Sequence, residues 1–223
     1  MRAAFDKLLS GFGFALAAVL LIAGGLLTWA SVFVGDTVHD QLSQQDITMP
    51  AGPALDALPA ADKAALEPYA GQPMTTGAQA KAYADHFILV HMNSGGVELA
   101  ETVGAMGVDT SGWQQPMTYS SAGTVSKQIA ADPTLSDSVK TEATAAVDTF
   151  RSETLFKGST LRGLLLYGYA FATIGTIAGY AAIAAFVGAG VLLILAVLGI
   201  WHARRAQHGE APAEVFEPTP AAV

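Results

Sequence analysis

Two long apolar stretches flank a more polar central region, and this pattern predicts two membrane-spanning helices. The first covers residues 8–34 and contains no charged residue. The second, Leu161–Trp201, contains a single charge, Arg162, near its start. As one helix it would be roughly 60 Å long, about twice the hydrocarbon thickness of a bilayer. We therefore divide it into an outer stalk helix, residues 161–179, and a membrane helix, residues 180–201.

The first apolar stretch has a second interpretation as a cleaved signal peptide, with Thr28-Trp29-Ala30 as the cleavage site. The apolar core of a signal peptide is usually about 7–15 residues long, and this stretch is much longer. We therefore expect an uncleaved anchor. In the second stretch, Tyr180 and Trp201 lie near the two ends of the predicted membrane helix, where interfacial aromatic residues are common.

The central region, residues 35–160, begins with a proline-rich connection. Asp36–Leu42 is expected to prolong the first helix outward. Half of the ten prolines of the chain follow between residues 48 and 77. Proline cannot donate a backbone hydrogen bond, so this segment is expected to be an irregular surface connection with one short helical turn near residues 61–66.

A helix is predicted to begin after this connection, where Thr76 and Gln79 have the spacing of a capping box. It is expected to end by Gly95-Gly96, because glycine commonly follows the last turn of a helix. Residues 97–116 are weakly patterned and are expected to form an extended excursion.

Two further helices are predicted before the second apolar stretch. One covers Ser121–Ala131, and the other begins at Ser136 with apolar residues at helical spacing. Gly158-Ser159 is expected to be the joint between this helix and the stalk. The fold class is thus an all-α membrane protein, in which a helical extracytoplasmic bundle packs on a long C-terminal stalk helix.

The bundle is expected to cover the apolar surface of the stalk, since an apolar helix outside lipid must be buried. The stalk residues expected to be covered include Leu164, Leu165, Leu166, Tyr167, Phe171 and Ile174. Small residues recur at Gly175-x-x-x-Gly179 and Ala181-x-x-x-Ala185, with Gly24-Gly25 on the first span, and such faces allow close helix contact. They are compatible with packing of the two spans or with a dimer.

Composition agrees with a membrane protein, because 52% of the residues are hydrophobic, 13% are charged, and the mean hydropathy is +0.40. Between residues 35 and 159 there are fifteen acidic and six basic residues, without a basic cluster, which argues against nucleic-acid binding. The chain has no cysteine and therefore no disulfide or thiol nucleophile.

Basic residues indicate the orientation of the two spans. Arg2 and Lys7 precede the first, and Arg204 and Arg205 follow the second. Positive residues are retained on the cytoplasmic side, so both termini are expected there, in a multi-pass protein of the cell membrane. The last segment, residues 202–223, is rich in proline, alanine and glutamate and is expected to be a disordered tail.

Six motifs suggest a relationship: VHDQL at 38–42 with QDITMP at 45–50, YAGQ at 69–72, AKAYADHFI at 80–88 with His91, TYS at 118–120, and TLFKGSTLRGLLL at 154–166. They resemble a family of small actinobacterial membrane proteins, often labelled automatically as aromatic ring-opening dioxygenases. The resemblance implies two spans around an external loop and no established activity. It does not cover residues 97–116, where this chain is longer than the usual pattern.

The residues argue against dioxygenase chemistry. An iron(II) oxygenase site requires two histidines and a carboxylate around one metal ion. The candidates are His39, His86 and His91 with Asp40 and Asp85, but His86 and His91 are about 140° apart around a regular helix. Neither span contains a histidine that could hold a haem. We expect no metal site and no other cofactor.

The candidates for ligand binding are Tyr83, His86, His91, Tyr119, Arg162 and Tyr167. With Tyr169, the tyrosines line a pocket beneath the stalk or are core aromatics, and the second interpretation is preferred. His91 shares a helical face with Tyr83 and Phe87 and is expected to be a hydrogen-bonded core histidine. His86 is expected at a polar helix edge. Arg162 is expected to pair with a carboxylate such as Asp85 or Glu153.

Three functions are compatible with these features. The first is a structural or accessory component of an envelope or respiratory membrane assembly, in contact with the bilayer and with other membrane proteins or itself. The alternative is an external module that binds a small ligand and acts as a sensor. An enzyme is least expected, because no combination of nucleophile, base and orienting residue can be assigned.

Overall fold

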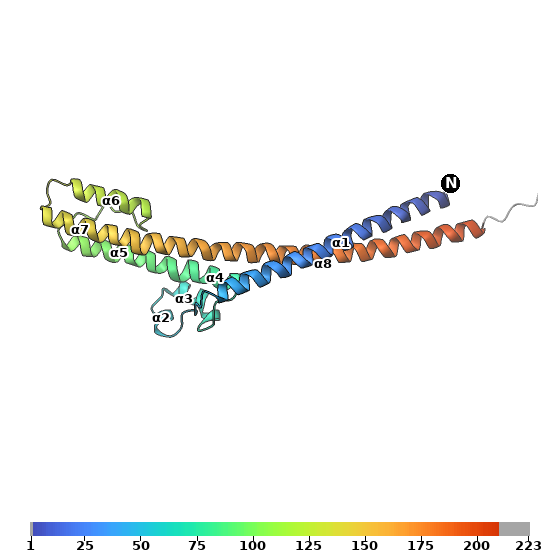
Figure 1. Cartoon of the computed structure of the whole chain (residues 1–223), viewed down its shortest axis with the longest axis horizontal. Coiled ribbons are helices and arrows are strands. Elements are labelled where there is room, and N and C mark those ends of the chain that lie inside the picture. Colours follow the sequence, from blue (N-terminus) through green and yellow to red (C-terminus); the bar gives the residue numbers. More distant parts are fainter. Residues whose placement is uncertain (1, 210–223) are drawn as a thin grey trace, which may run out of the picture. The chain divides into compact units, whose positions relative to one another are not determined.

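The computed structural model describes residues 2–209, and all regular elements in this range are helical (Figure 1). The elements are α1 Arg2–Ser43, α2 Pro53–Asp56, α3 Ala60–Leu66, the 3-10 turn η1 Glu67–Tyr69, α4 Gly77–Tyr83, the π-helix η2 Ala84–Ile88, α5 Leu89–Ala105, α6 Tyr119–Ala131, α7 Asp137–Thr149, the π-helix η3 Phe150–Phe156, and α8 Lys157–Gly209. The prediction of an all-α chain is confirmed for these residues.

The described residues divide into two compact units. One is Phe33–Gly175, and the other combines parts of Met1–Val32 and Thr176–Val223. In the latter unit, α1 and α8 pack in antiparallel orientation. Three glycines lie close to the partner helix, because a Cβ added to the glycine would approach a side chain there. The pairs are Gly13 with Ala196, Gly24 with Phe186, and Gly179 with Ser31.

A seven-residue repeat of small side chains allows this close packing. The buried positions of the repeat are Ser10, Ala17 and Gly24 on α1, and Ala182, Ala189, Ala196 and Ala203 on α8. Of the predicted small-residue face, Gly24 and Gly179 take part in the contact, but Ala181 and Gly25 are exposed. A spacing of seven keeps a residue on one face over many turns, whereas a single four-residue step defines only one turn.

Both long helices have the length and composition needed to cross a membrane. The candidate stretches are Phe5–Ser43, with a hydropathy of 2.2, and Asp137–Arg205, with a hydropathy of 2.8. Only 11% of the most apolar part of each is buried within the protein. Such stretches differ from the core helices of soluble proteins, which are mostly buried.

The helices of the Phe33–Gly175 unit are longer than the sequence predicts. The capping box at Thr76 is present and starts α4, but the helical run continues through Gly95 and Gly96 to Ala105. The prediction of a helix end there was wrong, as was the extended excursion for residues 97–105. A Cβ added at Gly95 would lie 3.0 Å from the ring of Phe150, so the glycine permits close helix packing instead.

The same reason explains the absence of a joint at Gly158-Ser159. α7, η3 and α8 follow one another without a break, and a Cβ added at Gly158 would lie 2.6 Å from Sδ of Met92. The glycine therefore allows α5 to approach α8. At the other end, α8 continues to Gly209, beyond the predicted end of the helix at Trp201. The remainder of the predicted tail, residues 210–223, lies outside the described residues.

Two hydrophobic clusters hold the Phe33–Gly175 unit together. In one, α5, α6, α7 and η3 pack side by side around buried Val103, Val147 and Leu155 (Figure 1). The other is formed by the end of α1, the segments α2 to η2 and α8, and includes Leu42 and Leu165.

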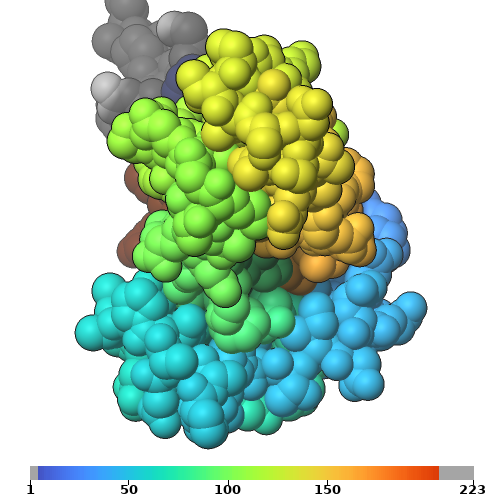
Figure 2. Space-filling view, turned by 90° about the vertical axis from the view of Figure 1, so that its left-hand side faces the viewer, coloured from blue at the N-terminus to red at the C-terminus, as the bar shows by residue number. Residues whose placement is uncertain are grey.

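The proline-rich connection contributes to the second cluster. Met49, Leu66 and Met74 are almost completely buried. Backbone hydrogen bonds tie its two ends together, with Met74 N donating to Ile47 O at 2.8 Å and Met49 N to Gln72 O at 2.9 Å. Figure 2 shows this segment in cyan as a compact mass beside the green α5. It is part of the core of the unit as well as a surface connection, and the predicted turn near residues 61–66 is α3.

The stalk is covered on one face only, which contradicts the expected burial of its apolar surface. Leu165 is 7% exposed and belongs to the core cluster, whereas Leu164 is 62%, Tyr167 67% and Phe171 56% exposed. Leu166 and Ala172 also pack against this cluster, whereas Ile174 is 57% exposed.

Candidate functional site

The candidate residues on the helical run from α4 to α5 form a ladder of rings. The ring centroids of Tyr83 and Phe87 are 4.9 Å apart, and those of Phe87 and His91 are 4.3 Å apart. His91 is exposed, and its Nδ1 is 2.8 Å from Phe87 O. Tyr83, Phe87 and His91 therefore share one helical face, as predicted. The expectation of a core histidine was wrong, because His91 lies beyond the hydrophobic cluster against which Tyr83 and Phe87 pack.

A charged cluster joins this helical run to α8. Asp85 Oδ1 accepts a hydrogen bond of 2.7 Å from Arg162 Nη2, and its Oδ2 accepts one of 2.5 Å from Lys81 Nζ. Lys81 Nζ also lies 5.8 Å from the ring centre of Tyr169. The expected pairing of Arg162 with Asp85 is therefore confirmed, whereas Glu153 pairs with Lys157 on its own helical run.

The electrostatics of Asp85 follow from this geometry. Burial alone would raise the pKa of its carboxyl, but the hydrogen bonds and positive charges of Lys81 and Arg162 outweigh burial and lower the pKa. The hydrogen bond to Asp85 and its charge raise the pKa of Lys81. With both carboxylate oxygens occupied and all three groups charged, the cluster is suited to clamping two helices and poorly suited to accepting a proton.

His86 makes a separate contact with the connection segment. Its Nδ1 is 2.8 Å from Asp62 Oδ1 on α3. The angle expected between His86 and His91 assumed a regular helix, but the π-helix η2 changes that angle. His86 and His91 nevertheless contact different partners, Asp62 and the backbone oxygen of Phe87. Among the described residues, no group of three His, Cys, Asp or Glu side chains is arranged to hold a metal ion.

Tyr119 lies at a second place in the unit, beside Arg151 of η3. The guanidinium carbon of Arg151 is 4.2 Å from the ring centre of Tyr119, a cation–π arrangement. Together with Ser120, Gly123 and Lys127 they line a shallow groove of about 260 Å³. The two cations distinguish this groove from the acidic surroundings of the central region.

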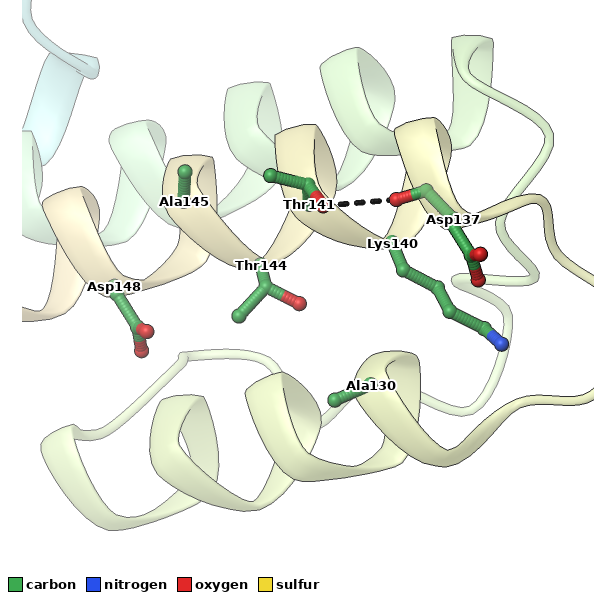
Figure 3. A pocket seen from close by; sticks show the side chains of 7 residues that line it. All are labelled: Ala130, Asp137, Lys140, Thr141, Thr144, Ala145 and Asp148. Atoms are coloured by element: carbon green, nitrogen blue, oxygen red, sulfur yellow. Dashed lines mark hydrogen bonds between the residues drawn. The ribbon is translucent and has the colours of Figure 1, made fainter.

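A larger groove of about 560 Å³ lies between α6 and α7 (Figure 3). Ala130 lines it from α6, and the remaining lining residues come from α7. Thr144 points toward α6, and its buried hydroxyl has no hydrogen-bond partner. Lys140 and the acidic Asp137 and Asp148 are at the surface, so the groove has mixed charge and is open to solvent.

The candidate residues are thus distributed over the unit and do not line one pocket. Tyr83 is half-buried in a hydrophobic cluster, and burial raises the pKa of its hydroxyl. Tyr119 lines the cationic groove, and Tyr167 is exposed on α8. The interpretation of the tyrosines as core aromatics holds for Tyr83 and is wrong for Tyr167.

Sequence reasoning identified Asp85 as a partner but missed the contributions of Lys81, Asp62 and Arg151. The spacing of Lys81 and Asp85, four residues apart on a helix, was the available signal for their pairing. Asp62 and Arg151 reach their partners only through tertiary packing. No protein-family model, curated protein sequence or solved structure matches the chain.

Proposed function

We propose that the chain is a two-span integral membrane protein whose central region is an extracytoplasmic helical domain, and that it serves as a structural or accessory component of an envelope or respiratory membrane assembly. The observation that carries this proposal is the exposure of apolar side chains along both long helices. On α1 these include Phe12, Ile22, Leu26 and Trp29, and on α8 they include Ile183, Val187, Ile194 and Leu198, all at least half exposed.

The exposed apolar surface supports placement in lipid. Removing apolar area from water is favourable by roughly 25 cal/mol per Å², so each large side chain contributes about 1.5–3 kcal/mol when it enters the bilayer. The helical backbone satisfies its own hydrogen bonds, which a membrane-spanning segment requires. The small-residue repeat provides the close helix contact that stabilises two spans in lipid, where apolar side chains gain little from contacting each other instead of lipid.

The chemistry of the central region supports a structural role. Its best-buried charged groups are engaged in contacts that tie helices together, as in the Asp85–Arg162 pair between η2 and α8. The two grooves described above are open to solvent, and their lining residues do not form a set of converging acid, base and nucleophile groups. A domain of this kind is suited to holding a fixed shape against a partner.

Co-purification tests the accessory role. The full-length protein is extracted in a mild detergent and its complexes are weighed by native mass spectrometry, with subunits identified by peptide mass. We expect at least one other membrane protein in fixed stoichiometry. The control is an unrelated two-span protein tagged at the same end and expressed at the same level. Recovery of the chain alone, as one copy or several, would contradict an accessory role.

A further inference from the structure

An uncharged apolar stripe runs along the uncovered face of α8. It consists of Leu161, Leu164, Tyr167, Phe171 and Ile174, which are between 53% and 67% exposed. From Leu164 onward the intervals are three, four and three residues, the spacing of a coiled-coil seam. The charged residue next to Leu161 on α8, Arg162, is bound to Asp85 of η2. We call these five residues the α8 seam.

Exposed charged side chains lie on the part of α1 that packs against this part of α8, so lipid is an unsuitable cover for the seam. Within the Phe33–Gly175 unit, Leu42 of α1 lies near Gly168, which is on the covered side of α8 between the positions of Tyr167 and Phe171 along the helix. The adjacent turns of α1 carry Asp36 and Asp40, both exposed. A charged side chain at the bilayer centre costs several kcal/mol, and the hydrocarbon region therefore excludes this level of the helix.

The area of the seam fits a helix-to-helix contact. Five side chains of roughly 200 Å² each, more than half exposed, present on the order of 600 Å² of apolar surface. That is as large as the largest patch on a typical monomer, and two facing seams would bury about 1,000 Å², the lower limit for a specific interface.

We propose that the α8 seam binds the α8 seam of a second copy of this chain, forming a parallel dimer. The inference rests on the proposed membrane placement, because two copies inserted in one orientation are related by an axis along the membrane normal. That symmetry makes the paired helices parallel and places equivalent residues opposite each other. An uncharged stripe meets its own copy without repulsion, and the 3-4-3 spacing keeps both stripes at the axis of a left-handed coiled coil.

Adjacent cysteine variants test the pairing in the natural cysteine-free background. Thr160, four residues before Leu164, continues the seam spacing, whereas its exposed neighbour Ser159 lies off the seam. A disulfide needs Cα atoms about 4.4–6.8 Å apart, which a parallel seam provides only for residues facing the axis. In membranes treated with a mild oxidant, Thr160→Cys should form a covalent dimer at least about tenfold more than Ser159→Cys.

A second variant breaks the seam without touching the core. Because Leu164 and Phe171 are exposed within one chain, the double variant L164Q/F171Q should keep its helix content and membrane retention. It should lose Thr160→Cys crosslinking, and its protein mass in detergent should fall to half that of the wild type.

Each outcome decides the proposal. If the wild type is monomeric but resists alkaline extraction from membranes, the dimer is overturned and the membrane placement stands. If alkaline treatment releases the protein into the soluble fraction, the membrane placement itself is overturned. Equal crosslinking of both cysteines, crosslinking of Thr160→Cys to a different protein, or protection of Leu164→Cys by lipid would each overturn the seam as a dimer contact.

Discussion

Asp85 links two parts of the chain through its two carboxylate oxygens. One oxygen accepts a hydrogen bond from Lys81 on the same helical run, and the other accepts one from Arg162 on α8. The side chain of Asp85 is only 20% exposed, so both bonds are less screened than those on the open surface. Contacts of this kind fix the position of one helix against another.

Replacing Asp85 by asparagine should destabilise the central region. D85N keeps the size of the side chain but removes the negative charge facing Lys81 and Arg162, and we expect a loss of about 1–3 kcal/mol. Thermal unfolding in detergent, followed by circular dichroism, measures the change. The matched control is Glu153→Gln, which removes an exposed ion pair within one helical run and should cost less than about 0.5 kcal/mol.

The loss of stability caused by D85N should depend on pH. Because the pKa of Asp85 is lower in the folded than in the unfolded protein, its contribution is fully present above the unfolded value of 3.8 and is lost as the pH falls through the folded pKa. Between pH 5 and strongly acidic solution, the stability difference between wild type and D85N should therefore shrink. A difference that stays constant or widens over this range would contradict the assignment.

At the scale of elements, glycine and alanine determine how closely the helices approach. Gly95 and Gly158 lie where a ring or a thioether from another helix packs against the backbone, and neither ends a helix. The seven-residue repeat does the same between α1 and α8. The local preference of glycine for helix ends is weaker than the packing energy gained when two helices come into close contact.

A disulfide tests the antiparallel register of α1 and α8. A Cβ at Gly13 would lie 3.3 Å from that of Ala196, close to the separation in disulfides. We expect the double variant Gly13→Cys/Ala196→Cys to form an intramolecular disulfide, detected by faster migration in a non-reducing gel and by the loss of free thiols.

The control for that disulfide is Gly11→Cys/Ala196→Cys, because a Cβ at Gly11 has no atom within 4 Å. It should keep both thiols free under the same oxidant. Similar disulfide yields in the two double variants would show that the two helices have no preferred register.

At the scale of the whole molecule, the two long apolar helices determine which environments the protein can occupy. Many of their large apolar side chains are exposed, whereas the helices between them carry most of the charged groups. The basic residues flanking the apolar stretches favour cytoplasmic termini, and the central region would then lie outside.

Single cysteines test this topology directly. In intact cells, Thr134→Cys in the central region should react with a membrane-impermeant maleimide, and His202→Cys after the second span should react only after lysis. Both positions are exposed within the chain, so their reactivity depends on the side of the membrane. The opposite pattern would reverse the orientation, and labelling of both in intact cells would contradict two spans.

The sequence alone determined the helical class, the two apolar stretches and the capped start of α4, and it predicted a carboxylate partner for Arg162 without choosing between Asp85 and Glu153. The first three depend on local signals, namely apolar runs and the capping spacing of Thr76 and Gln79. A side chain's neighbours along the helix are sufficient to produce such signals, so no knowledge of the fold is needed to read them.

Only the tertiary structure decided the roles of the glycines, the contacts of Asp62 and Arg151, and which face of α8 is exposed. Gly95 is a helix terminator by local preference and a packing site in the fold, because Phe150 is brought to it from more than fifty residues away. Leu164 and Leu165 are adjacent and chemically identical, yet one is exposed and the other buried. Burial depends on which face other helices cover, and that is a property of packing between distant segments.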